Sequence, residues 1–309
     1  MKNNNFISAV IYVNNNENQI EEALSNINQI LKQNFNKYEI ICVNDASTDK
    51  TEEKIRKFAT KLDDEVLVVI NMSYYQGLEL SMNAGVDLAI GDFVYEFDSI
   101  EQDYEQKIIM DVYEKCLQGY DIVSATSKTN KKRTSSLFYK IFNKYSNLKY
   151  KIHTETFRIL SRRAINRIYS ISKNIFYRKA IYASCGLAMY NLVYESRTKK
   201  RSKYSKDNKI NRKETGINSL ILFTNLGAKF SMIMSFIMIM ITIIVALYTV
   251  IIFMNNNPIQ GWTTTMLFLS IAFGGLFVIM TMIIKYLEII IKIIFREKNY
   301  TVESIDKLN

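Results

Sequence analysis

Histidine, proline and cysteine are scarce in this chain of 309 residues, which contains one histidine, one proline and three cysteines. The cysteines Cys42, Cys116 and Cys185 are odd in number and lack CxxC spacing, so neither a disulfide framework nor a zinc site is expected, and a reducing compartment fits. The single His153 excludes a His-rich metal site. Residues 6–13 form an apolar run that is too short to span a membrane and lacks a small-residue cleavage signal. This run predicts a first β-strand rather than a signal peptide.

The charge balance is basic, with a formal net charge of +10. Such a balance fits three kinds of partner: nucleic acid, an anionic membrane surface or an anionic substrate. Lysine and arginine are concentrated at residues 128–133 and 197–213, and the second of these stretches precedes long apolar segments. This placement favours a membrane or an anionic substrate over nucleic acid, although a nucleic-acid-binding basic protein stays as a third interpretation.

Short apolar runs alternate with longer amphipathic stretches through the first 145 residues. Strands are expected at residues 6–13, 39–43, 66–70, 93–97 and 121–125, and helices at 17–33, 50–62, 81–90, 104–120 and 137–145. Asn15 or Asn16 is expected to cap the first helix, and Ser47 or Thr48 the second. The alternation predicts an α/β fold with a mostly parallel, doubly wound sheet.

Acidic residues follow the strand expected at residues 93–97, where Asp98, Glu101 and Asp103 end the apolar run. The carboxyl ends of parallel strands are where open α/β sheets place their chemistry. Grouped carboxylates at that edge suit Mg²⁺ or Mn²⁺ and, through the metal, a diphosphate leaving group. The alternative is a strand that simply ends in a polar loop.

Two apolar runs without a charged residue occupy residues 230–254 and 262–284. Each exceeds the roughly 20 residues that a helix needs to cross a bilayer. Lysine and arginine flank both outer ends, so the pair is expected to form a hairpin in the cytoplasmic (inner) membrane with both chain termini in the cytoplasm. Two buried helices of a soluble domain are the alternative. The expected organisation is a domain at residues 1–214, a juxtamembrane amphipathic segment at 215–229, the hairpin at 230–285 and a cytoplasmic C-terminal segment at 286–309.

Four motifs, in order, are similar to those of one enzyme family. Residues 40–49 (IICVNDASTD) resemble its VDDGSTD element, residues 73–77 (SYYQG) its SRNFG, residues 157–163 (FRILSRR) its FRLMSRR, and Arg197 with residues 202–204 (SKY) its R…GESKY. With the hairpin, the chain resembles membrane-anchored glycosyltransferases of family 2 with the GT-A fold. These include dolichyl-phosphate mannose synthases and bacterial polyprenyl-phosphate glycosyltransferases. The resemblance covers about residues 6–300.

The resemblance implies roles for particular residues. It implies catalytic roles for Asp98, Arg197 and Lys203; nucleotide binding by Val13, Asn15, Glu17, Asp45, Gly77 and Ser99; acceptor-phosphate binding by Lys128, Lys132, Arg133 and Ser136; and a Mg²⁺ or Mn²⁺ site at Asp98, Gln102 and Glu101. The chain departs from the pattern most clearly at Ile100, which replaces the second acid of the metal motif. Asn44, Ala46, Tyr12 and Thr156 are further departures.

The expected activity is an inverting transfer of a hexose from a UDP- or GDP-sugar to a polyprenyl phosphate, on the cytoplasmic face of the membrane. The partners are then the nucleotide sugar, the lipid acceptor and membrane lipids, but not nucleic acid. The alternative that Ile100 favours is a non-catalytic, glycosyltransferase-like membrane protein. Gly274 and Gly275 permit close helix approach, so association of protomers through the hairpin is left open.

Overall fold

The structure is a computed structural model that describes residues 2–63, 65–128, 133–146, 148–171, 177–196, 206–224, 261–294 and 300–309, with short pieces between 226 and 244. It divides into two compact units, Met1–Ser219 with Glu297–Asn309, and Leu220–Arg296. The expected boundary at residue 214 lies near the first division. The C-terminal residues belong to the first unit, which the sequence interpretation did not anticipate.

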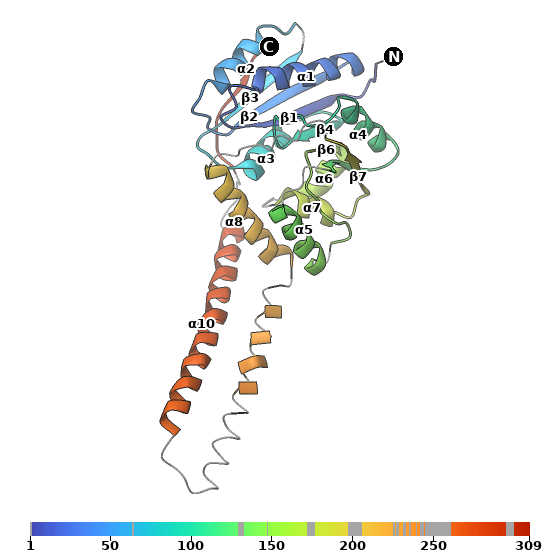
Figure 1. Ribbon diagram of the computed structural model, residues 1–309. Coiled ribbons are helices and arrows are strands. Elements are labelled where there is room, and N and C mark those ends of the chain that lie inside the picture. The colour runs from blue at the N-terminus through green and yellow to red at the C-terminus, as the bar shows by residue number, and fades with distance from the viewer. Residues whose placement is uncertain are drawn as a thin grey trace. The chain divides into compact units, whose positions relative to one another are not determined.

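An eight-stranded sheet in the order β7-β5-β6-β4-β1-β2-β3-β8 forms the centre of the first unit (Figure 1). Its strands are β1 (Ile7–Val13), β2 (Tyr38–Asn44), β3 (Val66–Met72), β4 (Phe93–Phe97), β5 (Ile122–Ser127), β6 (Phe157–Ser161), β7 (Met189–Tyr194) and β8 (Val302–Lys307). Strand β1 pairs in parallel with both β2 and β4, whereas β6 runs antiparallel to its two neighbours and β8 runs antiparallel to β3. The predicted α/β, mostly parallel sheet is confirmed.

Helices pack on both faces of the sheet, which explains why β1 is buried at all seven positions. The helices of this unit are α1 (Ile20–Asn34), α2 (Thr51–Ala59), α3 (Leu78–Leu88), α4 (Lys107–Leu117), α5 (Arg133–Tyr145), α6 (Arg162–Ile171) and α7 (Arg178–Ser184). Ala9 and Ile11 share a core cluster with the buried side of α1. Val10, which points to the opposite face, lies against Gly85 of α3, where an added Cβ would meet the Val10 Cγ1 at 2.3 Å. The absence of a side chain at Gly85 therefore lets α3 approach the sheet closely.

The predicted caps of the first two helices are wrong, because neither α1 nor α2, both fully described, begins with a side-chain cap hydrogen bond. The Asn15 side chain instead accepts a hydrogen bond from the Thr48 backbone N–H at 2.8 Å, and the Ser47 hydroxyl accepts one from the Asn15 N–H at 3.0 Å. The Asn16 side chain accepts one from the Asn14 N–H at 2.9 Å. These polar side chains therefore tie the loops after β1 and β2 to each other or turn back on their own loop.

The second unit contains α10 (Gly261–Ile294), a helix of 34 residues that includes the whole apolar run 262–284 and continues past it. An added Cβ at Gly275 would meet the Met238 sulfur at 3.1 Å, so this glycine allows a close contact within the unit. Much of the run 230–254 lies outside the described residues. Within the part of the chain that the structure describes, no helix has both the length and the apolar character required for a membrane crossing. Helix α8 (Lys206–Phe223) is continuous where the sequence suggested a polar stretch followed by a separate amphipathic segment.

Candidate active site

Three loops at the carboxyl edge of the sheet meet at the buried carboxylate of Asp45. The Asp45 N–H donates to the Val13 carbonyl at 2.9 Å, and the Tyr12 hydroxyl donates to the Asp45 carboxylate at 2.9 Å. The backbone N–H groups of Gln76 and Gly77 each donate to the same carboxylate at 2.8 Å. The structure thus brings together Val13, Asp45 and Gly77, three residues expected to bind the nucleotide.

Asp45 has no exposed surface, and its carboxylate receives these hydrogen bonds from the protein itself. In this conformation the side chain organises the loops, and the nucleotide binding that the resemblance implies for Asp45 stays a prediction. Burial raises the pKa of Asp45 above its ordinary value, and the N–H donors of Gln76 and Gly77 and the Tyr12 hydroxyl oppose part of that rise.

Asn15 and Glu17, also expected near the nucleotide, lie in the loop after β1 and hold the loop after β2. The Lys50 N–H donates to the Glu17 carboxylate at 3.1 Å, and the Lys54 ammonium donates to the Glu17 carbonyl at 2.6 Å. Asn15 has φ 53° and Ala46 has φ 49°, in the left-handed region that Asn tolerates better than Ala. The resembling family motif, VDDGSTD, has glycine where this chain has Ala46, and a glycine there would remove the steric cost of that conformation.

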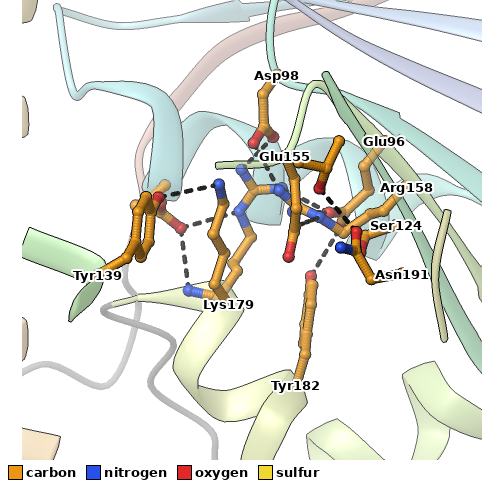
Figure 2. Close-up of polar contacts among 12 residues, drawn as sticks. Glu96, Asp98, Ser124, Tyr139, Glu155, Arg158, Lys179, Tyr182 and Asn191 are labelled. Atoms are coloured by element: carbon orange, nitrogen blue, oxygen red, sulfur yellow. Dashed lines mark hydrogen bonds and ion pairs between the residues drawn. The ribbon is translucent and has the colours of Figure 1, made fainter. Parts of the chain in front are cut away.

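Asp98 lies directly after β4 and is held by two guanidinium groups (Figure 2). One carboxylate oxygen is 2.6 Å from an Nη of Arg158, and the other is 2.7 Å from an Nη of Arg178. Strand β6 supplies Arg158, because its antiparallel register with β4 sets Arg158 opposite Glu96. Helix α7 supplies Arg178. Three segments far apart in the sequence therefore build this centre.

More carboxylates surround the two arginines, which are almost wholly buried. Glu96 lies 2.5 Å from Arg158 and 2.8 Å from Arg178, and the Tyr182 hydroxyl donates to Glu96 at 2.6 Å. The outer partners are Glu155, 2.9 Å from Arg158, and Glu79, 3.0 Å from Arg178. Ionised groups survive burial only when they are paired in this way. With Lys179, whose ammonium is 3.4 Å from the Tyr139 hydroxyl, the network holds three cations and four carboxylates.

The network keeps Asp98, Arg158 and Arg178 ionised. Burial alone would raise the pKa of Asp98, but the charges of Arg158 and Arg178 outweigh it and hold that pKa well below its ordinary value. Burial alone would lower the pKa of each arginine, and the surrounding carboxylates raise it instead. Asp98 is therefore a fixed carboxylate at neutral pH.

The metal ligands expected from the sequence are not assembled in this conformation. Both oxygens of Asp98 already contact guanidinium groups. The Gln102 side chain turns towards α1, where it accepts from Asn26 at 3.0 Å and donates to the Ala23 carbonyl at 3.3 Å. Among the described residues no group of three or more His, Cys, Asp or Glu side chains is placed to hold a metal ion, Glu101 included. The residues present do not fit a divalent cation held by several protein ligands.

The neighbours of Asp98 have structural partners. Ile100 is buried in the main hydrophobic cluster, which explains its apolar character at the position of the missing acid. The Ser99 hydroxyl accepts a hydrogen bond from the Glu101 N–H at 3.2 Å. Asp103 accepts hydrogen bonds from the hydroxyls of Tyr194 at 2.6 Å and Ser196 at 3.0 Å, so it fastens the chain after β7.

The residues expected to bind the acceptor phosphate are only partly described. Lys128, directly after β5, is 3.7 Å from Glu195, and both side chains are exposed. Arg133 begins α5, and Ser136 is exposed on the same helix. Three expected site residues lie outside the described residues: Lys132, Arg197 and Lys203.

The sequence interpretation missed Glu79, Glu96, Arg178 and Lys179. One signal was visible, because Glu96 interrupts the apolar strand 93–97 and a charge buried in a sheet requires a partner of opposite sign. Nothing in the sequence showed which of the 40 lysine and arginine residues that partner was.

Comparison with known proteins identifies the family to which the chain belongs. The sequence profile described as glycosyl transferase family 2 matches residues 8–186. The chain is 29% identical over 195 residues to an uncharacterized glycosyltransferase of Synechocystis sp., covering 61% of this chain and 60% of that one. It is 30% identical over 186 residues to a prophage bactoprenol glucosyl transferase homolog of Escherichia coli, covering 58% of this chain and 60% of that one. The chain therefore spans about 60% of the length of these relatives.

A solved structure agrees with the fold. The mannosyltransferase PcManGT of Pyrobaculum calidifontis, solved with GDP-Man and Mn²⁺, superposes with a TM-score of 0.50 at 15% identity, covering 71% of this chain and 63% of that one. This likeness supports a GT-A fold. With the profile spanning more than half of its residues, the chain belongs to glycosyl transferase family 2.

Proposed function

We propose that this chain is an inverting glycosyltransferase that moves a hexose from a UDP- or GDP-sugar to a polyprenyl phosphate at the cytoplasmic face of a membrane. The observation that carries the proposal is the meeting of the loops after β1, β2 and β3 at Asp45, on the sheet edge where β4 ends in Asp98. Ligands of open α/β sheets bind at the carboxyl ends of the strands. The bactoprenol glucosyl transferases among the relatives support a lipid phosphate as acceptor.

The acceptor phosphate is itself the nucleophile and is already ionised near neutral pH, so the reaction needs no strong general base. The protein then acts by positioning the two substrates and by stabilising charge on the departing diphosphate. In the proposal the loops that meet at Asp45 hold the nucleotide, and Arg197 and Lys203 hold the diphosphate. Asp98, fixed by Arg158 and Arg178, presents a rigid carboxylate at the carboxyl end of β4. Lys128, Lys132, Arg133 and Ser136 hold the acceptor phosphate.

Mg²⁺ or Mn²⁺ remains a prediction from the resemblance. The ion pairs of Asp98 with Arg158 and Arg178 occupy both carboxylate oxygens and disfavour a metal site built from several protein carboxylates. An activity assay with and without chelator tests whether sugar transfer depends on a metal ion.

We also propose a two-helix membrane hairpin at residues 230–285, with both chain termini in the cytoplasm. The two uncharged runs and their basic flanks support it. Strand β8 adds support. It follows the two apolar runs in the sequence, and it pairs with β3, which precedes them, in the same sheet. Strands of one sheet lie on one side of a membrane, so any crossings between them must be even in number. Alkaline phosphatase fused within residues 255–260 should be active in Escherichia coli and inactive when fused after residue 309; an active C-terminal fusion would refute the hairpin.

A second candidate function is a non-catalytic, glycosyltransferase-like membrane protein. The burial of Ile100 and the unassembled metal ligands favour it. Such a protein would bind a nucleotide sugar without transferring the sugar.

One assay separates the two candidates. Membranes containing the protein are supplied with polyprenyl phosphate and radiolabelled UDP-glucose, UDP-GlcNAc or GDP-mannose, in Mn²⁺, in Mg²⁺ and with chelator. Transfer from one donor, lost in Asp98→Ala, is the expected result. Full turnover by Asp98→Ala would refute the proposed role of Asp98 in sugar transfer. Nucleotide binding without transfer from any donor would establish the non-catalytic candidate.

A further inference from the structure

The last ten residues of the chain are built into the half of the sheet that carries the candidate donor loops. Strand β8 pairs with β3 over the whole length from Val68 to Met72. Just before β8, the Thr301 carbonyl accepts a hydrogen bond from the Ser73 N–H at 3.1 Å. The pairing therefore continues past the end of β3 into the loop at residues 73–77.

In that loop, the side-chain amide of Gln76 makes two hydrogen bonds to the backbone of Thr301. Its amide nitrogen donates to the Thr301 carbonyl at 2.6 Å, and its amide oxygen accepts from the Thr301 N–H at 2.9 Å. The side-chain amide thus copies the paired hydrogen bonds of a neighbouring strand. Gln76 is buried, so the loss of either bond would leave a polar group without water or a partner.

The backbone of Gln76 contacts Asp45, the residue at which the candidate nucleotide-binding loops meet. The N–H groups of Gln76 and Gly77 are the two amide donors that hold the Asp45 carboxylate, each at 2.8 Å. Gly77 adopts φ 84°, a conformation that favours glycine, and immediately precedes helix α3. A single residue therefore connects the C-terminal segment to the carboxylate at which the three loops meet.

We propose that the backbone of Thr301, where the C-terminal segment joins the sheet, is a positioning element of the donor site and that Gln76 is the positioning residue through which it acts. This inference rests on the proposed function, because it assigns the loop at residues 73–77 to nucleotide binding. The segment fixes the Gln76 side chain, and the fixed loop holds its two N–H groups on Asp45. Donor binding is complete only after the chain has returned from residues 220–296 to the edge of the sheet.

The test compares three substitutions in the whole 309-residue chain in detergent. Gln76→Leu keeps the approximate volume of the side chain and removes both hydrogen bonds to Thr301. Asp306→Asn is the matched control, since Asp306 anchors β8 to Arg56 of α2 and does not touch the loop. Gln76→Glu retains the acceptor for the Thr301 N–H but sets a carboxylate oxygen against the Thr301 carbonyl, so it also breaks the paired contact and serves if Gln76→Leu does not fold.

Binding of UDP and GDP is measured by calorimetry, KM and kcat by sugar transfer, and folding by the thermal midpoint. Gln76→Leu should weaken binding of the preferred nucleotide and raise the donor KM by about tenfold, as expected from the loss of roughly one net hydrogen-bond energy. The acceptor KM and kcat should stay within about twofold of the parent values. Gln76→Glu should show an effect in the same direction, and Asp306→Asn should leave nucleotide binding unchanged.

An unchanged nucleotide Kd in both Gln76 variants would overturn the inference. So would an equal weakening in Asp306→Asn, because the segment would then act only through overall stability. If the parent protein binds nucleotide but transfers no sugar, the proposed function fails while the Kd comparison still tests the inference. If the parent protein binds neither UDP nor GDP, both fail.

Discussion

Replacing Asp98 by Asn tests the centre of the candidate site, because the new side chain has nearly the same shape and no charge. Asp98 contributes one oxygen at 2.6 Å to Arg158 and the other at 2.7 Å to Arg178. Asn can accept from only one of the two guanidinium groups and would turn its NH₂ group towards the other. The substitution therefore removes one charge-assisted contact and weakens the second.

The expected loss of unfolding free energy depends on the ion pairs that Arg158 and Arg178 keep in the variant. A hydrogen bond to a charged group contributes about 1.5–3 kcal/mol, and removing one partner of a buried ion pair costs about 3–5 kcal/mol when the other charge is left alone. Neither arginine is left alone here, since Arg158 keeps Glu96 and Glu155 and Arg178 keeps Glu79 and Glu96. We expect the free energy of unfolding to fall by about 2–3 kcal/mol, which is the upper part of the range for a hydrogen bond to a charged group and below the cost of an unpaired buried charge.

The assays are urea unfolding followed by circular dichroism and the sugar-transfer reaction. Asp121→Asn is the matched control, because Asp121 is also a buried carboxylate of this sheet paired with an arginine, Arg163 at 2.6 Å, whose side chain is largely exposed. The control should lose about 1 kcal/mol of stability and keep its transfer activity. Asp98→Asn should lose stability and at least 100-fold in transfer. Unchanged stability would refute the ion-pair argument, and unchanged transfer would refute the site.

Three further predictions concern pH, thiol protection and packing. The lowered pKa of Asp98 means that its contribution to stability is complete above its ordinary pKa of about 3.9, declines below that value and is lost as the pH falls through the lower pKa of the folded state. The difference in unfolding free energy between the parent and Asp98→Asn should therefore shrink from pH 7 to pH 3, and a constant difference would contradict this. Burial raises the pKa of Cys42 and of Cys116 to about 12, so iodoacetamide at pH 8 should label neither in the native protein and both in urea, as mass spectrometry would show. Gly85→Ala should destabilise the protein by about 1–3 kcal/mol in urea unfolding, because its Cβ would overlap Val10; a stabilised variant would refute the close packing of α3.

The central strands were predictable because each is a continuous apolar run. Residues 6–13 and 93–97 carry that signal, and the structure has strands within one residue of those bounds. Local hydrogen bonding was less predictable. Asn15 and Ser47 have the side chains of helix caps, yet they bind each other's loops, and no local pattern distinguishes the two uses.

Strand β8 was missed for a related reason. Its residues alternate between half-buried and exposed positions, with Glu303 and Lys307 among the exposed ones, so it has no continuous apolar run. An edge strand has one neighbouring strand and needs little hydrophobic content. Its assignment depends on β3, which lies more than 200 residues away in the sequence.

The candidate site shows a different limit. A strand that ends in carboxylates predicts a metal site and an arginine-bound site equally well, because both satisfy the same buried negative charge. The choice depends on the antiparallel register that sets Arg158 opposite Glu96 and on the position of α7, which supplies Arg178. Neither follows from residues 93–103 alone. The resemblance supplied the metal, and the structure supplies the guanidinium groups.

The two halves of the site differ in what holds them in place, and this has a consequence for the proposed reaction. Asp98 is fixed by ion pairs from β6 and α7 within the first 184 residues. The donor loop is fixed through Gln76 by Thr301, at the other end of the chain. Since Thr301 follows the second unit, the proposed donor half depends on a segment that is synthesised after that unit and lies beyond the proposed hairpin. If the loop at residues 73–77 binds the donor as proposed, the donor site cannot be complete before the C-terminal segment has joined the sheet.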